Sequence, residues 1–141
     1  MSLYLDTSVL MPLYVEEKTS AAMAVWLEAT SEALLVSDLT RGEFAAAVSR
    51  LVRMRALEKH HGVEIVAAFE EWCDVRGTRV ENLPSDIREA AHLVRQPTPR
   101  LLMPDAIHLV ACSRLGAILV TLDDDLVQIG DREAVAVLVP S

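Results

Sequence analysis

Short runs of aliphatic residues alternate along the chain with segments in which apolar residues recur every three or four positions. Four runs are long enough for buried strands, and they lie at residues 3–5, 33–36, 117–121 and 134–138. Residues 79–83 alternate in polarity before Pro84, which indicates one more short strand. The pattern therefore predicts five strands distributed over the length of the chain.

The segments between these strands have the periodicity of amphipathic helices. Phe44, Val48 and Leu51 recur at intervals of three or four residues, which predicts a long helix over residues 39–57. Pro104 suits the first turn of a helix and Gly116 suits its end. The other expected helices lie at residues 8–15, 18–30, 62–76, 85–95 and 104–115, and a short helix or turn begins at Asp123.

The alternation of strands and helices predicts the α/β class. Strands that are continuous aliphatic runs are typical of a mostly parallel sheet that helices cover on both faces. With 141 residues and no repeat or linker, one domain over residues 1–141 is the expected organisation. The sequence thus predicts a single domain with a central, mostly parallel sheet.

Several features of the composition bear on the compartment. Charged residues interrupt the apolar segments too often for a membrane span, and the first residues lack the pattern of a secretory signal. Cys73 and Cys112 have no C-x-x-C spacing and are expected to be free, buried thiols. We therefore expect a cytoplasmic protein with no membrane association.

Four acidic residues occupy matching places in this pattern of strands and helices. Asp6 and Asp123 follow predicted strands, whereas Glu43 and Asp105 lie in the first turns of predicted helices. In a parallel α/β fold the carboxyl ends of the strands and the amino ends of the following helices share one edge of the sheet. The sequence therefore predicts that all four carboxylates lie at that edge.

A group of carboxylates at one edge has a chemical consequence. Two of them about 4 Å apart repel each other by roughly 4 kcal/mol at an effective dielectric constant of 20, so they need a cation or must bind protons. Oxygen donors favour Mg²⁺ or Mn²⁺ over Zn²⁺, and no Cys or His occupies a matching position in the sequence. Such an ion can activate water and neutralise charge during phosphodiester hydrolysis, with no Ser or His nucleophile.

Each of the four acids also has a purely structural interpretation. Asp6 and Asp123 can act as helix N-caps, and Asp105 can favour the positive end of its helix. Glu43 can complete a capping box with Thr40. Both interpretations stay open for each residue at the level of sequence.

The overall charge argues against a broad nucleic-acid-binding surface. The formal net charge is -8, and phosphate contacts need clustered basic residues. However, eleven of the thirteen basic residues are Arg, which suits bidentate phosphate contacts. The candidates for contact with a nucleic acid or a protein partner are Arg41, Arg50, Arg53, Arg55 and Arg100.

Four short motifs, in this order and spacing, resemble those of PIN-domain ribonucleases, in particular the VapC-type toxins of bacterial toxin–antitoxin pairs. The motifs are Leu5-Asp6-Thr7-Ser8, Glu43 after Ser37-x-Leu39, the helix start Pro104-Asp105-Ala106-Ile107-His108-Leu109, and Val120-Thr121-x-Asp123. The match covers essentially the whole chain, and the specificity lies in the order and spacing of motifs that are weak individually.

The resemblance implies a Mg²⁺- or Mn²⁺-dependent endoribonuclease that acts on structured RNA. It also implies inhibition by a cognate antitoxin and a homodimer. The catalytic and metal-binding residues it implies are Asp6, Glu43, Asp105 and Asp123. Ser8 and Thr121 resemble the hydroxyls that support the metal site, and Asp125 is a further candidate for assisting it.

Other polar residues and other functions receive simpler interpretations. His108 is expected to be a structural histidine within an apolar helix, and His60-His61 an exposed helix boundary. Two-component receiver domains need a lysine late in the fold, which this sequence lacks, and haloacid-dehalogenase phosphatases need an Asp where Ser8 stands. The strongest alternative is a PIN fold without catalysis that binds RNA or a partner.

Overall fold

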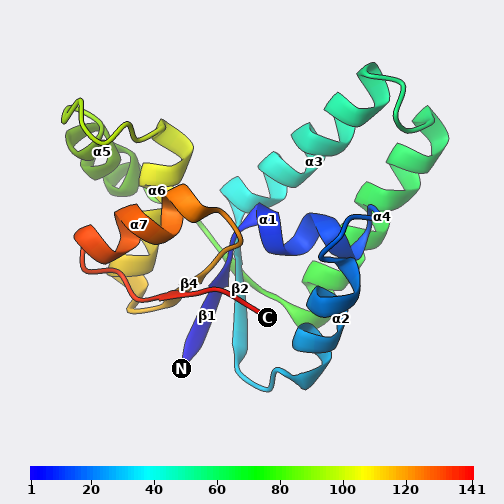
Figure 1. Ribbon diagram of the computed structural model, residues 1–141, viewed down its shortest axis with the longest axis horizontal. Helices are drawn as coiled ribbons and strands as arrows, with labels where there is room; N and C mark the ends of the chain where they lie inside the picture. Colours follow the sequence, from blue (N-terminus) through cyan, green and yellow to red (C-terminus); the bar gives the residue numbers. More distant parts are fainter.

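Five parallel strands form the central sheet of the computed structural model, which describes residues 1–141 (Figure 1). The strands are β1 (Ser2–Leu5), β2 (Ala33–Ser37), β3 (Thr78–Val80), β4 (Ile118–Val120) and β5 (Val137–Leu138), in the spatial order β3-β2-β1-β4-β5. Tyr4 in the central strand pairs with Leu35 on one side and Leu119 on the other. All four neighbouring pairs are parallel, so the predicted α/β class and parallel sheet are confirmed.

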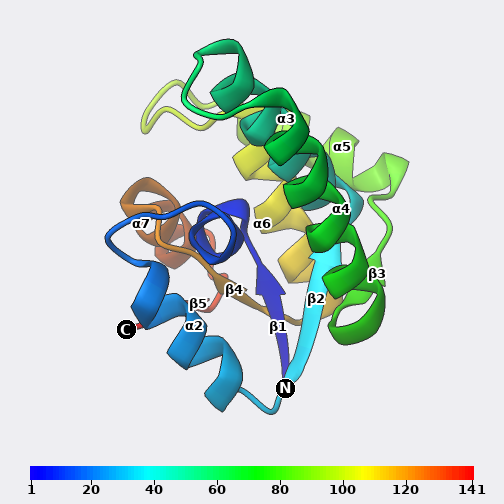
Figure 2. The same ribbon diagram turned by 90° about the vertical axis from the view of Figure 1, so that its right-hand side faces the viewer.

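Helices cover both faces of this sheet. They are α1 (Thr7–Leu10), α2 (Ser20–Ala29), α3 (Asp38–Arg53), α4 (Lys59–Arg76), α5 (Pro84–Leu93), α6 (Met103–Leu115) and α7 (Asp124–Arg132), with a 3₁₀ turn η1 at Met11–Leu13. Figures 1 and 2 show α2, α3 and α4 on one side of the sheet and α5, α6 and α7 on the other. None of the helices combines the length and the apolar composition that a membrane span requires.

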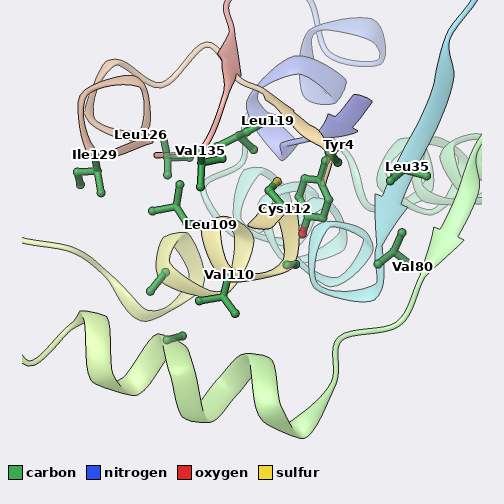
Figure 3. Packing of buried hydrophobic residues seen from close by; sticks show 14 of the residues in the cluster. Tyr4, Leu35, Val80, Leu109, Val110, Cys112, Leu119, Leu126, Ile129 and Val135 are labelled. Atoms are coloured by element: carbon green, nitrogen blue, oxygen red, sulfur yellow. The ribbon is translucent and has the colours of Figure 1, made fainter. Parts of the chain in front are cut away.

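Alternate residues of each strand supply two separate hydrophobic cores. Leu3 and Leu5 of β1 pack with Phe44 and Phe69 on the side of α1 to α4. Tyr4 lies between them in sequence and points to the opposite side, into the core that residues of α6 and α7 also fill, and Cys112 of α6 lies next to it (Figure 3). Because the side chains of a strand alternate between faces, the aliphatic runs of the sequence fill both cores.

The connection between α3 and α4 differs from the prediction. The predicted helices over residues 39–57 and 62–76 are Asp38–Arg53 and Lys59–Arg76 in the structure. The first of them stops early because Arg55 has a φ of 59°, the left-handed conformation that usually marks glycine at a helix end. Its neighbour Ala56 donates its backbone N–H to the carbonyl of Leu51, which closes the helix without a glycine.

Two other boundaries have local causes. The helix predicted over residues 8–15 is α1 followed by the 3₁₀ turn η1, because Pro12 has no N–H with which to continue an α-helix. The helix α6 ends as predicted before Gly116, which has a φ of 61°. The strands at residues 79–83 and 134–138 are shorter than predicted, and both are the edge strands of the sheet.

An ion pair joins α5 to α6, the helix that carries Asp105 and His108. Arg114 donates from Nε and from a terminal nitrogen to the two oxygens of Asp86, at 2.8 and 2.9 Å, and Asp86 also accepts from the backbone N–H of Leu83. The Asp86 side chain is only 1% exposed. Burial raises its pKa, but the bonds from Arg114 and Leu83 outweigh burial and hold the pKa below its usual value.

Replacing Arg114 with Met should destabilise the domain, because it leaves the carboxylate of Asp86 buried without its partner. We expect a loss of about 2 to 3 kcal/mol in the free energy of unfolding at pH 7, measured by urea denaturation. The control is Arg79→Met, which removes an exposed ion pair with Asp38 and should leave stability nearly unchanged. Equal effects of the two substitutions would show that the buried pair does not hold α5 against α6.

Candidate functional site

The four predicted acids all lie at the carboxyl edge of the sheet. Asp6 follows β1 and is the N-cap of α1, and Asp123 follows β4 and is the N-cap of α7. Glu43 is the sixth residue of α3, which begins directly after β2, and Asp105 is the third residue of α6. In Figure 1 the carboxyl ends of β1 and β2 lie at the top of the sheet, where α1 and α3 begin. The predicted common edge is therefore present.

Asp6 is buried and held by hydroxyl groups. Its Oδ2 accepts hydrogen bonds from Ser8 Oγ at 2.7 Å and from Thr121 Oγ1 at 2.9 Å. It also accepts from the backbone N–H of Ser8, so the N-cap interpretation is correct as well. Its Oδ1 lies 3.8 Å from Nε2 of His108. The two hydroxyls named from the sequence thus fix one oxygen of Asp6 and leave the other directed into the site.

Glu43 takes no part in a capping box. The N-cap of α3 is Ser37, whose Oγ accepts from the backbone N–H of Thr40, so Thr40 lies inside the helix and cannot cap it. The carboxylate of Glu43 instead accepts a hydrogen bond from Thr7 Oγ1 at 3.3 Å and lies 2.5 Å from His108 Nε2. The structural alternative for Glu43 is therefore wrong, and its side chain points toward Asp6.

Asp105 is the acid most affected by its surroundings. Burial raises its pKa to about 6, and the charges of Asp123, Asp6 and Glu43 act in the same direction, while His108 opposes them. An elevated carboxylate pKa means that the folded chain resists the ionised form of this residue. The charges of the other three acids reach Asp105, so the four form one electrostatic group.

Asp123 and Asp125 lie at the outer part of this edge. Asp123 Oδ1 accepts from the backbone N–H groups of Asp125 and Leu126, at 2.9 and 3.4 Å, so Asp123 does cap α7. Both aspartates line a surface pocket together with Asp105 and Arg100. The structure brings Asp125 to the rim of the site, where its side chain is exposed.

His108 is the residue that the sequence analysis underestimated. It is fully buried, as a structural histidine would be, yet its Nε2 faces Glu43 and Asp6. One ligand atom each from Asp6, Glu43 and His108 lie within 4.8 Å of one another. The available signal was its spacing of three residues from Asp105, which places both on one face of α6.

The donor set fits a divalent cation. Carboxylates predominate, as Mg²⁺ and Mn²⁺ prefer, and the pKa of Asp105 is raised by burial first and by the charges of Asp123, Asp6 and Glu43 in addition. The premise that no histidine accompanies the acids is wrong, because Nε2 of His108 lies 2.5 Å from Glu43 and 3.8 Å from Asp6.

Among the arginines that the sequence offers for contact with a partner, some make contacts within the domain and others line pockets near the site. Arg41 pairs with Glu70 and Asp74 of α4, so its guanidinium serves the packing of α3 on α4. Arg100 lines the pocket that contains Asp105 and Asp123, and Arg50 lines a second pocket with Thr7 and Ser8. The pair His60-His61 is exposed at the start of α4, as expected for a helix boundary.

Comparison with known families gives one match over most of the chain. The sequence profile of the PIN domain matches residues 3–132. Among curated proteins, none matches the sequence.

Several solved structures share the fold. VapC20 of Mycobacterium tuberculosis, described as a toxin that cleaves the sarcin-ricin loop, has a TM-score of 0.74 and 17% identity, over 91% of this chain and 95% of that chain. VapBC2 of Rickettsia felis, bound to a DNA fragment from its promoter, has a TM-score of 0.72 and 14% identity over 100% of both chains. VapBC-1 of nontypeable Haemophilus influenzae has a TM-score of 0.68 and 14% identity, over 98% and 97%.

Replacing Asp105 with Asn should stabilise the metal-free chain at neutral pH. Because the pKa of Asp105 is about 6 when folded and near 3.8 when unfolded, its stabilising contribution is complete below pH 3.8 and is lost as the pH rises through 6. At pH 7.5 with EDTA, we expect Asp105→Asn to gain roughly 2 kcal/mol, and at pH 4 almost nothing.

Thermal or urea unfolding at the two pH values measures this difference. The matched control is Asp131→Asn, which removes an exposed carboxylate of α7 and should show no such dependence. A destabilised Asp105→Asn at pH 7.5 would contradict the electrostatic account of the site.

Proposed function

We propose that this chain, which belongs to the PIN-domain family, is a metal-dependent endoribonuclease and the toxin of a VapC-type toxin–antitoxin pair. The observation that carries the proposal is the convergence of four carboxylates at the carboxyl edge of the sheet, with the pKa of Asp105 raised by burial and by the other three. A group of carboxylates that repel one another costs folding free energy, so a purely structural role does not explain it. A bound cation would offset this cost, because it neutralises the repulsion and stabilises the folded state to which it binds.

In this proposal Asp6, Glu43, Asp105 and Asp123 hold Mg²⁺ or Mn²⁺. When bound, the ion would supply a Lewis acid for the activation of water and for neutralising charge on the phosphate. Ser8 and Thr121 orient Asp6 through its Oδ2, so that Oδ1 faces the site. Asp125 lies where it can assist at the rim. Water attacks phosphorus in line with the departing 3′ oxygen, which leaves 5′-phosphate and 3′-hydroxyl ends.

RNA is the proposed substrate, because the chain resembles in fold a toxin described as cleaving the sarcin-ricin loop. A cognate antitoxin is the proposed inhibitor, because other chains with this fold were solved as VapBC assemblies. We further propose that the protein acts in the cytoplasm as a homodimer. Arg100 beside Asp105 and Asp123 offers a cation for an RNA phosphate, which offsets the acidic character of the edge.

Removal of Asp6 should abolish RNA cleavage. Purified wild type, free of antitoxin, is mixed with total RNA and Mg²⁺, and fragments are followed by gel electrophoresis. We expect cleavage that EDTA stops and that Asp6→Asn reduces by at least about 100-fold, since even indirect partners of a metal contribute 10- to 100-fold. Asp131→Asn is the control with an unchanged site and should cleave like wild type.

The products separate this mechanism from others. Fragments with 5′-phosphate ends support attack by water, whereas 2′,3′-cyclic phosphate ends would exclude it. If wild type and Asp6→Asn leave RNA equally intact, the proposal of an enzyme is wrong. The alternative, a PIN fold that only binds RNA or a partner, then replaces it.

Divalent metal should stabilise the folded chain through these acids. A ligand that binds only the folded state raises the melting temperature, so Mg²⁺ or Mn²⁺ should raise that of wild type by several degrees. The increase should be much smaller for Asp105→Asn, measured by differential scanning fluorimetry. Equal increases of the melting temperature in both proteins would show that Asp105 does not contribute to metal binding.

A further inference from the structure

The imidazole of His108 connects the interior of the domain to the acidic edge. Its Nδ1 lies 2.7 Å from the hydroxyl of Tyr4, and its Nε2 lies 2.5 Å from Glu43 Oε1. The side chain is fully buried, and the Tyr4 and His108 rings meet edge to face at 5.5 Å. Three strands or helices thus meet at one side chain: β1 through Tyr4, α3 through Glu43, and α6 through His108 itself.

A chain of hydroxyl groups connects His108 to the interior of the domain. The hydroxyl of Tyr4 donates to Ser37 Oγ at 2.8 Å, and Ser37 donates to Thr40 Oγ1 at 3.1 Å. Thr40 in turn donates to the carbonyl of Leu5 at 3.2 Å. A carbonyl can only accept, so the hydroxyl of Thr40 is the donor at the end of this chain. The chain anchors the Tyr4 hydroxyl beside Nδ1 of His108 and so fixes the ring from the core side.

The opposite nitrogen then has a defined role. An unprotonated Nε2 would present a lone pair to a carboxylate oxygen at 2.5 Å, which is repulsive. A proton between Nε2 and Glu43 removes the repulsion and makes a charge-assisted hydrogen bond. His108 thus donates from Nε2 to Glu43 on the side of the site, while its Nδ1 contacts the Tyr4 hydroxyl on the core side.

The bond to Glu43 matters because that side chain is long and partly exposed. The Glu43 side chain is 29% exposed and accepts one further hydrogen bond, from Thr7 Oγ1 at 3.3 Å. Without His108, its carboxylate would be free to turn toward solvent, away from the repulsion of Asp6. His108 itself cannot move, since it is enclosed in the core and bonded to Tyr4.

We propose that His108 is a positioning residue that holds the Glu43 carboxylate beside Asp6 and thereby sets the affinity of the site for a divalent cation. This inference rests on the proposed metal-dependent function, and it assigns to His108 a role through Glu43 rather than direct contact with the reacting atoms. Partners that orient metal ligands typically contribute 10- to 100-fold to affinity.

Two substitutions of His108 provide a matched test. The amide nitrogen of His108→Gln reaches the position of Nε2 and can donate to Glu43, whereas that of His108→Asn reaches only the position of Nδ1, near Tyr4. Both replace a buried ring with a buried amide, so they share the cost of lost packing. Mn²⁺ binding to the metal-free proteins is measured by the loss of the free Mn²⁺ signal in electron paramagnetic resonance, and folding by circular dichroism.

We expect His108→Asn to weaken Mn²⁺ binding by about 10- to 100-fold, and His108→Gln to stay within a few-fold of wild type. Tyr4→Phe, which removes the bond that anchors the ring, should fall between them. Equal affinities in wild type and a folded His108→Asn would overturn the positioning role while the metal site remains. Should His108→Asn fail to fold, a His108→Gln that binds as weakly as Asp6→Asn would overturn it.

Two further outcomes separate this inference from its premise. Failure of wild type to bind Mn²⁺ would overturn both the proposed function and the role of His108. Pulsed measurements on the wild-type Mn²⁺ complex report nitrogen in direct contact with the ion. We expect no such coupling from His108, and a nitrogen coupling that disappears in His108→Gln would make the residue a ligand and contradict the proposal.

Discussion

The site depends on the repulsion between carboxylates that the parallel sheet gathers at one edge. Asp6 and Asp123 end neighbouring strands, and α3 and α6 bring Glu43 and Asp105 to the same place. Partial burial limits how far water screens these charges, and burial is the main cause of the elevated pKa of Asp105. Stability alone does not explain this arrangement of carboxylates, whereas the binding of a cation does.

The rest of the domain restrains these repelling groups. Ser8 and Thr121 hold one oxygen of Asp6, and backbone N–H groups of α7 hold Asp123. His108 restrains Glu43 from within the core, and the Arg114–Asp86 pair fixes α6 against α5. The acids are thus preorganised by hydrogen bonds, one of which leads through His108 to Tyr4 in a hydrophobic core, so a cation meets ligands that need little rearrangement.

Much of this could be predicted from the sequence, because the edge position of an acid follows from its place after a strand or at a helix start. Glu43 could not be separated from a capping box, since the cap of α3 depends on Ser37, which also bonds to Tyr4 of another strand. His108 looked structural because its neighbours in sequence are apolar, and its contact with Glu43 arises only when α3 meets α6. The left-handed Arg55 likewise had no local signal.

The most direct test of the central claim is anomalous diffraction from crystals grown with Mn²⁺, which locates the ion without relying on activity. The account predicts a peak at the carboxyl edge of the sheet, with oxygens of Asp6 and at least one more of the four acids at about 2.1 Å, the distance usual for small hard cations. At saturating Mn²⁺, no peak there, or a peak only at the exposed Glu58, His60 and His61, would contradict it.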